Sequence, residues 1–421
     1  MELMSTKALL DAITPANVIH GKRMTDNMLR WRLRFLHLLN TPLYQLQPSL
    51  MAVTGCRIVK LSLEHGFCSE SAIGLQIYGH SVINVLKNVE ECLKWNQAGL
   101  RLVESLEAKP LIPRIKLNVY ILSYWKEPLQ AKIESLKEVH KELLMVGDMS
   151  VISMNAGHFC KRSQVCGRNL LTAEKECAAL LHEMYQLRQM TPLLALISYH
   201  INILKLIGCN IDSQQQPNKP LFHLLGKNEI DSEDGLLQYA LSNQLVGPAQ
   251  NCYFDRLMLA FFFREYSEAV QYAEKYSRCH QSPRIADLFQ TFYQGVSAFR
   301  LARLEDDKAE EWKGVGNNAI SQYQTWVKYS EWNWENKLLL LEAELHVCDG
   351  ELEMAKSKFK ASIDSARRHR FVHEEGLASE LLGTFLDESG EEAEESKRQF
   401  AHARSCYQKW GAFALADRLL E

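Results

Sequence analysis

Apolar residues recur every three to four positions along most of the chain, which is the spacing of one face of an α-helix. The periodic segments are rich in Leu, Ala, Glu, Lys and Gln, run for about 12 to 20 residues, and are separated by short breaks such as Val146-Gly147-Asp148 and Cys348-Asp349-Gly350. No run of alternating β-branched residues is long enough to indicate a sheet. The pattern therefore predicts an all-α fold.

Small and large side chains alternate along the second helix of several predicted helix pairs. Ala355, Phe359 and Ser362 lie at positions i, i+4 and i+7, which share one helix face. The same spacing occurs at Ser396, Phe400 and Ala403, and more loosely at Ala269, Ala273 and Tyr276 and at Cys92, Asn96 and Gly99. Small residues let a neighbouring helix approach and the ring fills the gap between hairpins, as in tetratricopeptide-type repeats. We therefore expect a right-handed α-solenoid of seven or eight degenerate tetratricopeptide-like helical hairpins.

Two segments interrupt this pattern. Residues 208–235 are polar and punctuated by prolines, and we expect an exposed insertion there. Residues 1–48 are less regular and carry one basic amphipathic helix, Met28 to Leu39, which Pro42 and Pro48 follow. The predicted organisation is an irregular N-terminal segment, 1–48, and a solenoid, 49–421.

The composition excludes several classes of protein. The chain has 421 residues, of which 47% are hydrophobic and 24% charged, and this argues against disorder. Its 48 basic and 51 acidic residues give a formal net charge of −3 and no reason to expect nucleic-acid or anionic-membrane binding. The most apolar stretch, Leu193 to Ile207, contains polar residues and is too short to cross a bilayer. We expect neither nucleic acid nor membrane as a partner.

The eleven cysteines are scattered, odd in number and without a C-x-x-C pair. Several lie in apolar helical stretches, where a thiol behaves as a small hydrophobe. The N-terminus lacks a basic region followed by an unbroken apolar run, so no secretory signal is visible. These features predict a cytoplasmic protein with reduced thiols.

The sequence contains no recognisable catalytic or nucleotide-binding motif. It lacks the patterns G-x-x-x-x-G-K-[ST], G-x-G-x-x-G, H-R-D, D-F-G, G-x-S-x-G and H-E-x-x-H. His158-Phe159-Cys160 with Cys166 resembles a loose metal cluster, but no fourth ligand lies nearby. His373-Glu374-Glu375 could suggest an acid–base pair, although such neighbours on helices are usually solvated surface. We therefore expect no enzyme activity, no cofactor and no metal site.

Two further features have structural explanations. Arg367-Arg368-His369-Arg370 lies at a predicted helix C-terminus, where cations complement the helix dipole. An aromatic cluster contains Tyr323, Trp326, Tyr329, Trp332 and Trp334. No basic stripe accompanies the cluster, so we expect it to pack between hairpins and not to stack on bases.

Two patterns near the C-terminus are more specific than a helical repeat. The pattern F-x-x-E-x-x-L-A-x-E-L is matched by Phe371, Glu374, Leu377, Ala378, Glu380 and Leu381. The pattern A-R-x-x-Y-x-x-W-G-A is matched by Ala403, Arg404, Tyr407, Trp410, Gly411 and Ala412. Looser similarities lie upstream at Arg57 to Gly66, Tyr124 to Leu129 and Gly147-Asp148. Together these stretches resemble the tetratricopeptide-like solenoid of large signalling proteins that also carry serine/threonine-kinase-like, AAA/STAND ATPase, GAF and histidine-kinase domains.

The resemblance implies a sensing or scaffolding role in signal transduction. This chain has no counterpart of the family's kinase, ATPase, GAF or histidine-kinase domains, so none of the family's catalytic residues has a position here. The first hypothesis is a non-catalytic helical-repeat scaffold that binds a protein or peptide, with a signalling kinase or ATPase as the implied kind of partner. The alternative is a regulatory or sensor segment, a fragment or split partner, of an ATPase-coupled signalling kinase. An enzyme with an unrecognised site is a third hypothesis.

In hairpin arrays the first helices line a concave groove. We assume that Ala355 and Ala269 occupy equivalent positions in their repeats. The first helices then face the groove with Ser81, Asn84, Asn251, Met258, Lys337 and Glu344. We expect these residues to contact a partner. The alternative is that they are ordinary helix-surface residues.

Overall fold

The computed structural model describes residues 2–40, 42–43, 47–209, 230, 232–279, 284–390 and 392–420. Every regular element among these residues is a helix, and the one β-type contact is an isolated bridge between Arg23 and Phe67. The predicted all-α fold is confirmed. The chain divides into two compact units, and one boundary between them falls inside a helix, between Asn155 and Ala156, while Lys126–Ile133 also belong to the second unit.

Unit 1 takes its described residues from Met1–Trp125 and Glu134–Asn155. Its elements are α1 (Glu2–Asp11), α2 (Pro15–Ile19), α3 (Asn27–Leu38), α5 (Pro48–His65), α6 (Ser69–Leu86), α7 (Val89–Ser105), α8 (Ile112–Leu122), η1 (Ser123–Trp125), most of α9 (Ile133–Val146) and the start of α10 (Met149–Val165). Helices α5, α6 and α7 pack consecutively, and α1, α2 and α3 pack on them.

The N-terminal residues are more regular than the sequence pattern indicates. Leu10 of α1 and Val18 of α2 are fully buried in the same core as Tyr78 and Trp95. Helix α3 occupies the stretch predicted as a basic helix and begins after Asp26, whose carboxylate accepts hydrogen bonds from two main-chain amides of the first turn. Residues on both sides of position 49 therefore share one core.

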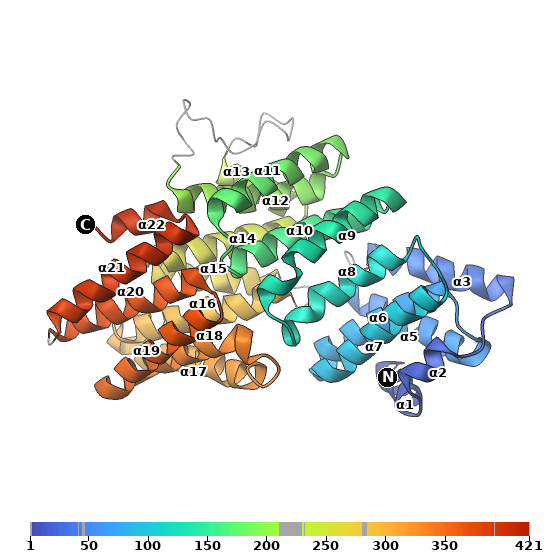
Figure 1. The fold of residues 1–421 in the computed structure, drawn as a ribbon, viewed down its shortest axis with the longest axis horizontal. Helices are drawn as coiled ribbons and strands as arrows, with labels where there is room; N and C mark the ends of the chain where they lie inside the picture. Colours follow the sequence, from blue (N-terminus) through green and yellow to red (C-terminus); the bar gives the residue numbers. More distant parts are fainter. Residues whose placement is uncertain are drawn as a thin grey trace. The chain divides into compact units, whose positions relative to one another are not determined.

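Unit 2 takes its described residues from Lys126–Ile133, Ala156–His280 and Arg284–Glu421. Its elements are η2 (Leu129–Lys132), the end of α10, α11 (Leu170–Gln186), α12 (Met190–Ile207), α13 (Glu233–Ser242), α14 (Val246–Phe262), α15 (Tyr266–Arg278), α16 (Ile285–Ala302), η4 (Asp306–Lys308), α17 (Ala309–Trp326), α18 (Glu331–Cys348), α19 (Leu352–Arg368), α20 (Val372–Ser389), α21 (Ala393–Trp410) and α22 (Phe413–Arg418). The pairs α14–α15, α16–α17, α18–α19 and α20–α21 follow one another from yellow to red in Figure 1. The architecture is thus helical and repeat-like.

The small–large–small positions face inward between these pairs. Ala355, Phe359 and Ser362 are buried on α19. The Ser362 hydroxyl donates to the main-chain oxygen of Asn336 on α18 at 2.7 Å, and the Phe359 ring lies 5.8 Å from the ring of Phe385 on α20. These residues therefore join neighbouring pairs.

Three residues of the predicted aromatic cluster, Tyr323, Trp326 and Trp334, pack together, whereas the Trp332 ring lies 4.8 Å from the His369 ring. The Tyr323 ring lies 4.9 Å from that of Trp326 and 6.2 Å from that of Trp334. The Tyr323 hydroxyl donates to the main-chain oxygen of Leu288 on α16 at 2.7 Å. The cluster thus links α16, α17 and α18. The basic run also lies as predicted, because α19 ends at Arg368 with cations in its last turn.

Helix α12 is, among the described residues, the one helix long and apolar enough to cross a membrane, with a mean hydropathy of 1.4, and 67% of it is buried inside the protein. Two of its buried polar side chains, Ser198 and Asn202, have partners within unit 2. Ser198 donates to the carboxylate of Asp255 on α14 at 2.7 Å, and Asn202 donates to the Asp255 main-chain oxygen at 2.9 Å. These contacts are those of a core helix.

The predicted insertion, 208–235, lies mostly outside the described residues. At its described edges, Gly208 follows α12 in the left-handed backbone region, and the hydroxyl of Ser232 caps α13 by accepting from the Gly235 amide at 3.1 Å.

Candidate functional site

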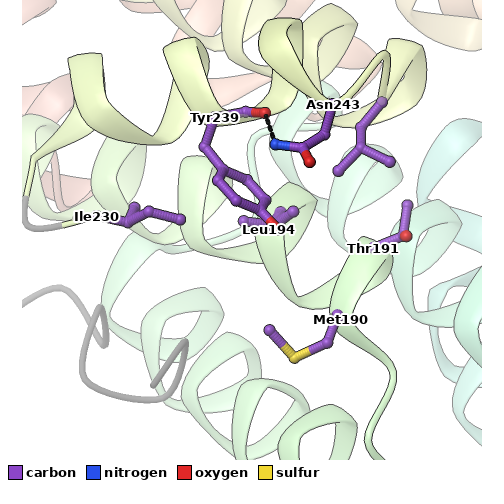
Figure 2. A pocket seen from close by; sticks show the side chains of 7 residues that line it. Met190, Thr191, Leu194, Ile230, Tyr239 and Asn243 are labelled. Atoms are coloured by element: carbon purple, nitrogen blue, oxygen red, sulfur yellow. Dashed lines mark hydrogen bonds between the residues drawn. The ribbon is translucent and has the colours of Figure 1, made fainter. Parts of the chain in front are cut away.

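A cavity of about 320 Å³ lies between α12 and α13 in unit 2 (Figure 2). The lining residues are Met190, Thr191, Leu194, Ile230, Tyr239, Asn243 and Leu245. Four are apolar and three are polar but uncharged. This lining is suited to an apolar side chain.

The two walls of the cavity are fixed differently. Leu194 is buried in the core one turn into α12, whereas Met190, at the start of α12, is 40% exposed at the rim. On the other wall, the Asn243 amide donates to the main-chain oxygen of Tyr239 at 2.9 Å (Figure 2). Gln244 has a φ of 56°, and this turn brings Leu245 back to the lining. The cavity therefore has a rigid floor and an accessible edge.

Three of the predicted groove residues lie in the interior of unit 2. Met258, Lys337 and Glu344 have 0% exposure. A side chain without exposed surface has no atom that a partner could contact. These three residues therefore do not line an open groove in this structure.

The other three predicted groove residues do not form a common site. Ser81 is buried in unit 1 and its hydroxyl donates to the main-chain oxygen of Ile77 at 2.7 Å. Asn84, also in unit 1, and Asn251, in unit 2, are partly exposed. The structure thus leaves two of the six positions with accessible side-chain surface.

The chain's own residues contact α14 and α18, which are first helices of two of the pairs in unit 2. We call residues 127–132 and 161–167 the inner segments. The Asn333 side chain on α18 donates to the Glu127 main-chain oxygen at 2.8 Å and accepts from the Leu129 amide at 2.9 Å. Lys161 forms an ion pair with Asp255 on α14 at 3.0 Å. These contacts occupy the side of the array that the sequence pattern assigns to a partner.

A buried ion pair lies beneath the inner segments. The Lys337 ammonium is 2.7 Å from the Glu374 carboxylate, and the two side chains are 0% and 1% exposed. Lys337 also donates to the Asn333 main-chain oxygen at 2.9 Å, and Asn336 donates to Glu374 at 2.6 Å. Burial raises the pKa of Glu374 and lowers the pKa of Lys337, while their mutual attraction acts in the opposite direction on each.

Glu344 has a similar environment. Its carboxylate lies 3.2 Å from the Arg300 guanidinium and 3.0 Å from that of Arg303. A third buried carboxylate, Glu380, pairs with Arg264 at 2.5 Å and also with Arg418, so it joins α20 to the end of α14 and to α22. Each buried acid in this interior is therefore matched by a cation, as the cost of burying charge requires.

The residues predicted as solvated His–Glu neighbours are buried. His373 is 0% exposed, and Glu374 and Glu375 are 2% and 9% exposed. Burial and the nearby Lys337 ammonium lower the pKa of His373 to about 3, so the ring is neutral at pH 7. The expectation of a solvated surface is wrong here because α20 is covered on both sides.

Glu375 belongs to a cluster that the sequence pattern did not single out. Donor atoms of Glu375, His402 and Cys406 all lie within 4.8 Å of one another. The His402 Nε2 atom is 2.8 Å from Glu375 Oε1 and 3.7 Å from Cys406 Sγ. Burial raises the pKa of the Cys406 thiol to about 12, and the Glu375 charge adds to this. The available signal was the His402-x-x-x-Cys406 spacing, which places both side chains on one helix face.

The His158, Cys160 and Cys166 group does not gather its donor atoms in the same way. Among the described residues, only the Glu375 cluster has three such atoms together. The buried thiol of Cys166 instead donates to the Ser163 main-chain oxygen at 3.6 Å. No disulfide joins cysteines of the described chain. The sequence matches no protein-family model and no curated protein.

Proposed function

We propose that the chain is a non-catalytic helical-repeat scaffold that binds an apolar side chain of a protein or peptide partner in the cavity between α12 and α13. The observation that carries the proposal is the lining of that cavity. It presents apolar surface with a few neutral polar groups and a partly exposed methionine at the rim. Methionine-containing apolar surfaces adapt to the shape of a bound side chain.

The absence of charge from the lining favours binding over chemistry. None of the seven lining residues carries a carboxyl, an imidazole, a thiol or an amine. The hydroxyls of Thr191 and Tyr239 could act as nucleophiles only with an adjacent base to activate them, and none of the seven lining residues offers such a base. A peptide side chain needs only apolar contact and partners for its main-chain groups.

The partner's class follows from the sequence resemblance and not from the cavity. The C-terminal patterns resemble the solenoid of signalling kinases with an ATPase domain, so a signalling kinase or ATPase is the partner that we propose. Its role would be signal transduction in the cytoplasm. A regulatory segment of such a kinase would use the same cavity for an intramolecular contact.

The test uses two matched methionine variants. Met190 and Met354 are exposed residues in the first turns of α12 and α19, where an acidic residue is tolerated by the helix dipole. Peptides selected from a displayed random library on the purified chain should bind Met190→Asp about 10-fold or more weakly, because an apolar contact of this size contributes about 1.5–3 kcal/mol. Met354→Asp should bind them as the unmodified chain does.

Fluorescence polarisation of the selected peptides gives both dissociation constants. Equal affinity for the two variants would exclude the cavity as the binding site. Failure to enrich any peptide would count against the binding function itself.

A further inference from the structure

We infer that Glu375, His402 and Cys406 form a binding site for a zinc-type divalent cation on the α20–α21 pair. The inference is independent of the proposed function, because these residues do not line the cavity between α12 and α13. It rests on the donor set, the distances, the rigidity of the two helices and the access of the site to solvent.

The donor set selects the kind of metal. One thiol, one imidazole and one carboxylate are the three ligand types that zinc combines in proteins. Calcium and magnesium take oxygen ligands and would leave the thiol and the imidazole unused. Three protein ligands leave a fourth tetrahedral position for water or for a ligand from another molecule.

Two of the three donor separations can be compared with those of a tetrahedral site, and the third is within 4.8 Å. Zinc bonds of about 2.0–2.1 Å to nitrogen and oxygen and about 2.3 Å to sulfur separate tetrahedral donors by roughly 3.4–3.6 Å. The observed separation of His402 Nε2 and Cys406 Sγ is 3.7 Å, so these two atoms need almost no movement. Glu375 Oε1 and His402 Nε2, now 2.8 Å apart and hydrogen-bonded, need to separate by about 0.6 Å to admit the cation.

The helices hold this geometry because Gly376 lets them come close. A Cβ atom added to Gly376 on α20 would lie 3.0 Å from the Cys406 Cβ atom and 3.0 Å from the Tyr407 ring on α21. The Tyr407 hydroxyl donates to the Glu380 carboxylate at 2.5 Å, one turn further along α20. The two ligands on α21 are thus fixed opposite the one on α20.

A cation can enter from the side of His402. The His402 side chain is 34% exposed, while that of Glu375 is 11% exposed and Cys406 is buried. The entry is covered by Arg367, whose guanidinium donates to Glu375 Oε1 at 2.8 Å and has a nitrogen 3.4 Å from His402 Nε2. The Arg367 side chain is 53% exposed and also pairs with Asp364 at 3.0 Å, so it has a second partner when the metal displaces it.

The experiment is a titration of the chelator-treated full chain with Co²⁺, the spectroscopic probe for zinc sites with thiolate ligands. We expect one Co²⁺ per chain, a thiolate-to-cobalt charge-transfer band in the near ultraviolet, and loss of the band when Zn²⁺ is added. Binding replaces the proton of the Cys406 thiol, so one proton is released to the buffer per metal bound.

Variants separate this site from adventitious binding to other cysteines. Cys406→Ser should lose the charge-transfer band, and His402→Gln, at a more exposed position, should weaken Co²⁺ binding at least 10-fold. Cys348→Ser is the matched control, because Cys348 is also a helical cysteine and is partly exposed. Among the hydrogen bonds of the described residues, its thiol contacts only the Phe299 main-chain oxygen. The charge-transfer band should persist in Cys348→Ser. Arg367→Ala should tighten binding, because a competing cation is removed.

A band that persists in Cys406→Ser, or the absence of a stoichiometric band in the unmodified chain, would overturn the proposal. Unchanged Co²⁺ affinity in Arg367→Ala would overturn the position assigned to the metal, because there Arg367 and the cation compete for the same carboxylate. Far-ultraviolet circular dichroism of each variant confirms that the helices are retained.

Discussion

Replacing Lys337 by Met should destabilise unit 2 far more than an ordinary lysine substitution does. The methionine keeps most of the apolar contact but leaves the Glu374 carboxylate buried, with Asn336 as its remaining hydrogen-bond donor. The ammonium also lies 4.1 Å from the centre of the Phe371 ring, and this cation–π contact is lost as well.

The magnitude follows from the burial of both charges. Removing one member of a buried, hydrogen-bonded pair costs about 3–5 kcal/mol, because the other charge stays buried without compensation. The double variant Lys337→Met, Glu374→Gln removes both charges and should recover most of this loss. The difference between the single and double variants is then the coupling of the pair.

The matched control is Lys358→Met. Lys358 pairs with Glu342 at 2.6 Å between the neighbouring helices α19 and α18, but these side chains are 30% and 21% exposed. A solvated pair of this kind contributes about 0–1 kcal/mol. The control therefore has similar geometry and differs mainly in burial.

Urea unfolding followed by tryptophan fluorescence measures these free energies, and Trp334, whose ring centre is 5.7 Å from the Lys337 ammonium, reports on the site. A loss of less than about 1 kcal/mol in Lys337→Met, equal to that of Lys358→Met, would refute the reasoning. It would mean that water reaches the pair in solution.

Two further predictions concern the backbone of unit 2 and the pH response of unit 1. Gly167→Ala should lower the free energy of unfolding by about 2–5 kcal/mol, because Gly167 has a φ of 71° and a Cβ atom there would overlap the His373 ring. The control Gly350→Ala should lower it by only about 1–2 kcal/mol, because Gly350 has a φ of 75° but no atom near its Cβ. Equal losses in urea unfolding would contradict this prediction. Burial and the charge of Arg114 lower the pKa of His37 to about 4 from its ordinary value of 6.5, so the unfolded chain takes up the proton first as the pH falls. The free energy of unfolding of unit 1 should then fall by about 1 kcal/mol per pH unit between pH 6.5 and 4, and His37 should not affect it above pH 6.5. His37→Gln should reduce this dependence on pH. An unchanged dependence in His37→Gln would exclude His37 as its cause.

The features that the sequence predicts well are those set by neighbours within one or two helical turns. The i, i+4, i+7 spacing of Ala355, Phe359 and Ser362 identifies the inward face of α19, and the cations before Arg370 identify its end. Such patterns report which side of a helix is apolar. They do not report what covers that side.

The groove residues show this limit. Lys337 and Glu344 are charged, and an isolated helix would place them in water. They are buried because each is paired with an opposite charge. The partner of Lys337 is Glu374, 37 residues away in the sequence, and a partner of Glu344 is Arg303, 41 residues away. A local pattern contains no information about such pairs.

The Glu375 cluster shows the same limit in a different form. The spacing of His402 and Cys406 is visible in the sequence, but Glu375 lies 27 residues before His402. Its place depends on the register of α20 against α21, and Gly376 helps to set that register. The sequence spacing could therefore indicate two of the three residues of the cluster, but not Glu375.

The inner segments change how unit 2 can fold and how its sequence can evolve. In an open repeat array each hairpin contacts only its neighbours, so folding spreads from any point and whole hairpins can be gained or lost. Here the bond between Leu129 and Asn333 closes a loop of 204 residues, and Arg418 of α22 donates to the main-chain oxygen of Phe262, 156 residues earlier. Contacts at such separations slow folding and make the hairpins fold together. Inserting or deleting one hairpin would misalign every later helix with the inner segments, so the interior of unit 2 fixes the number of its repeats.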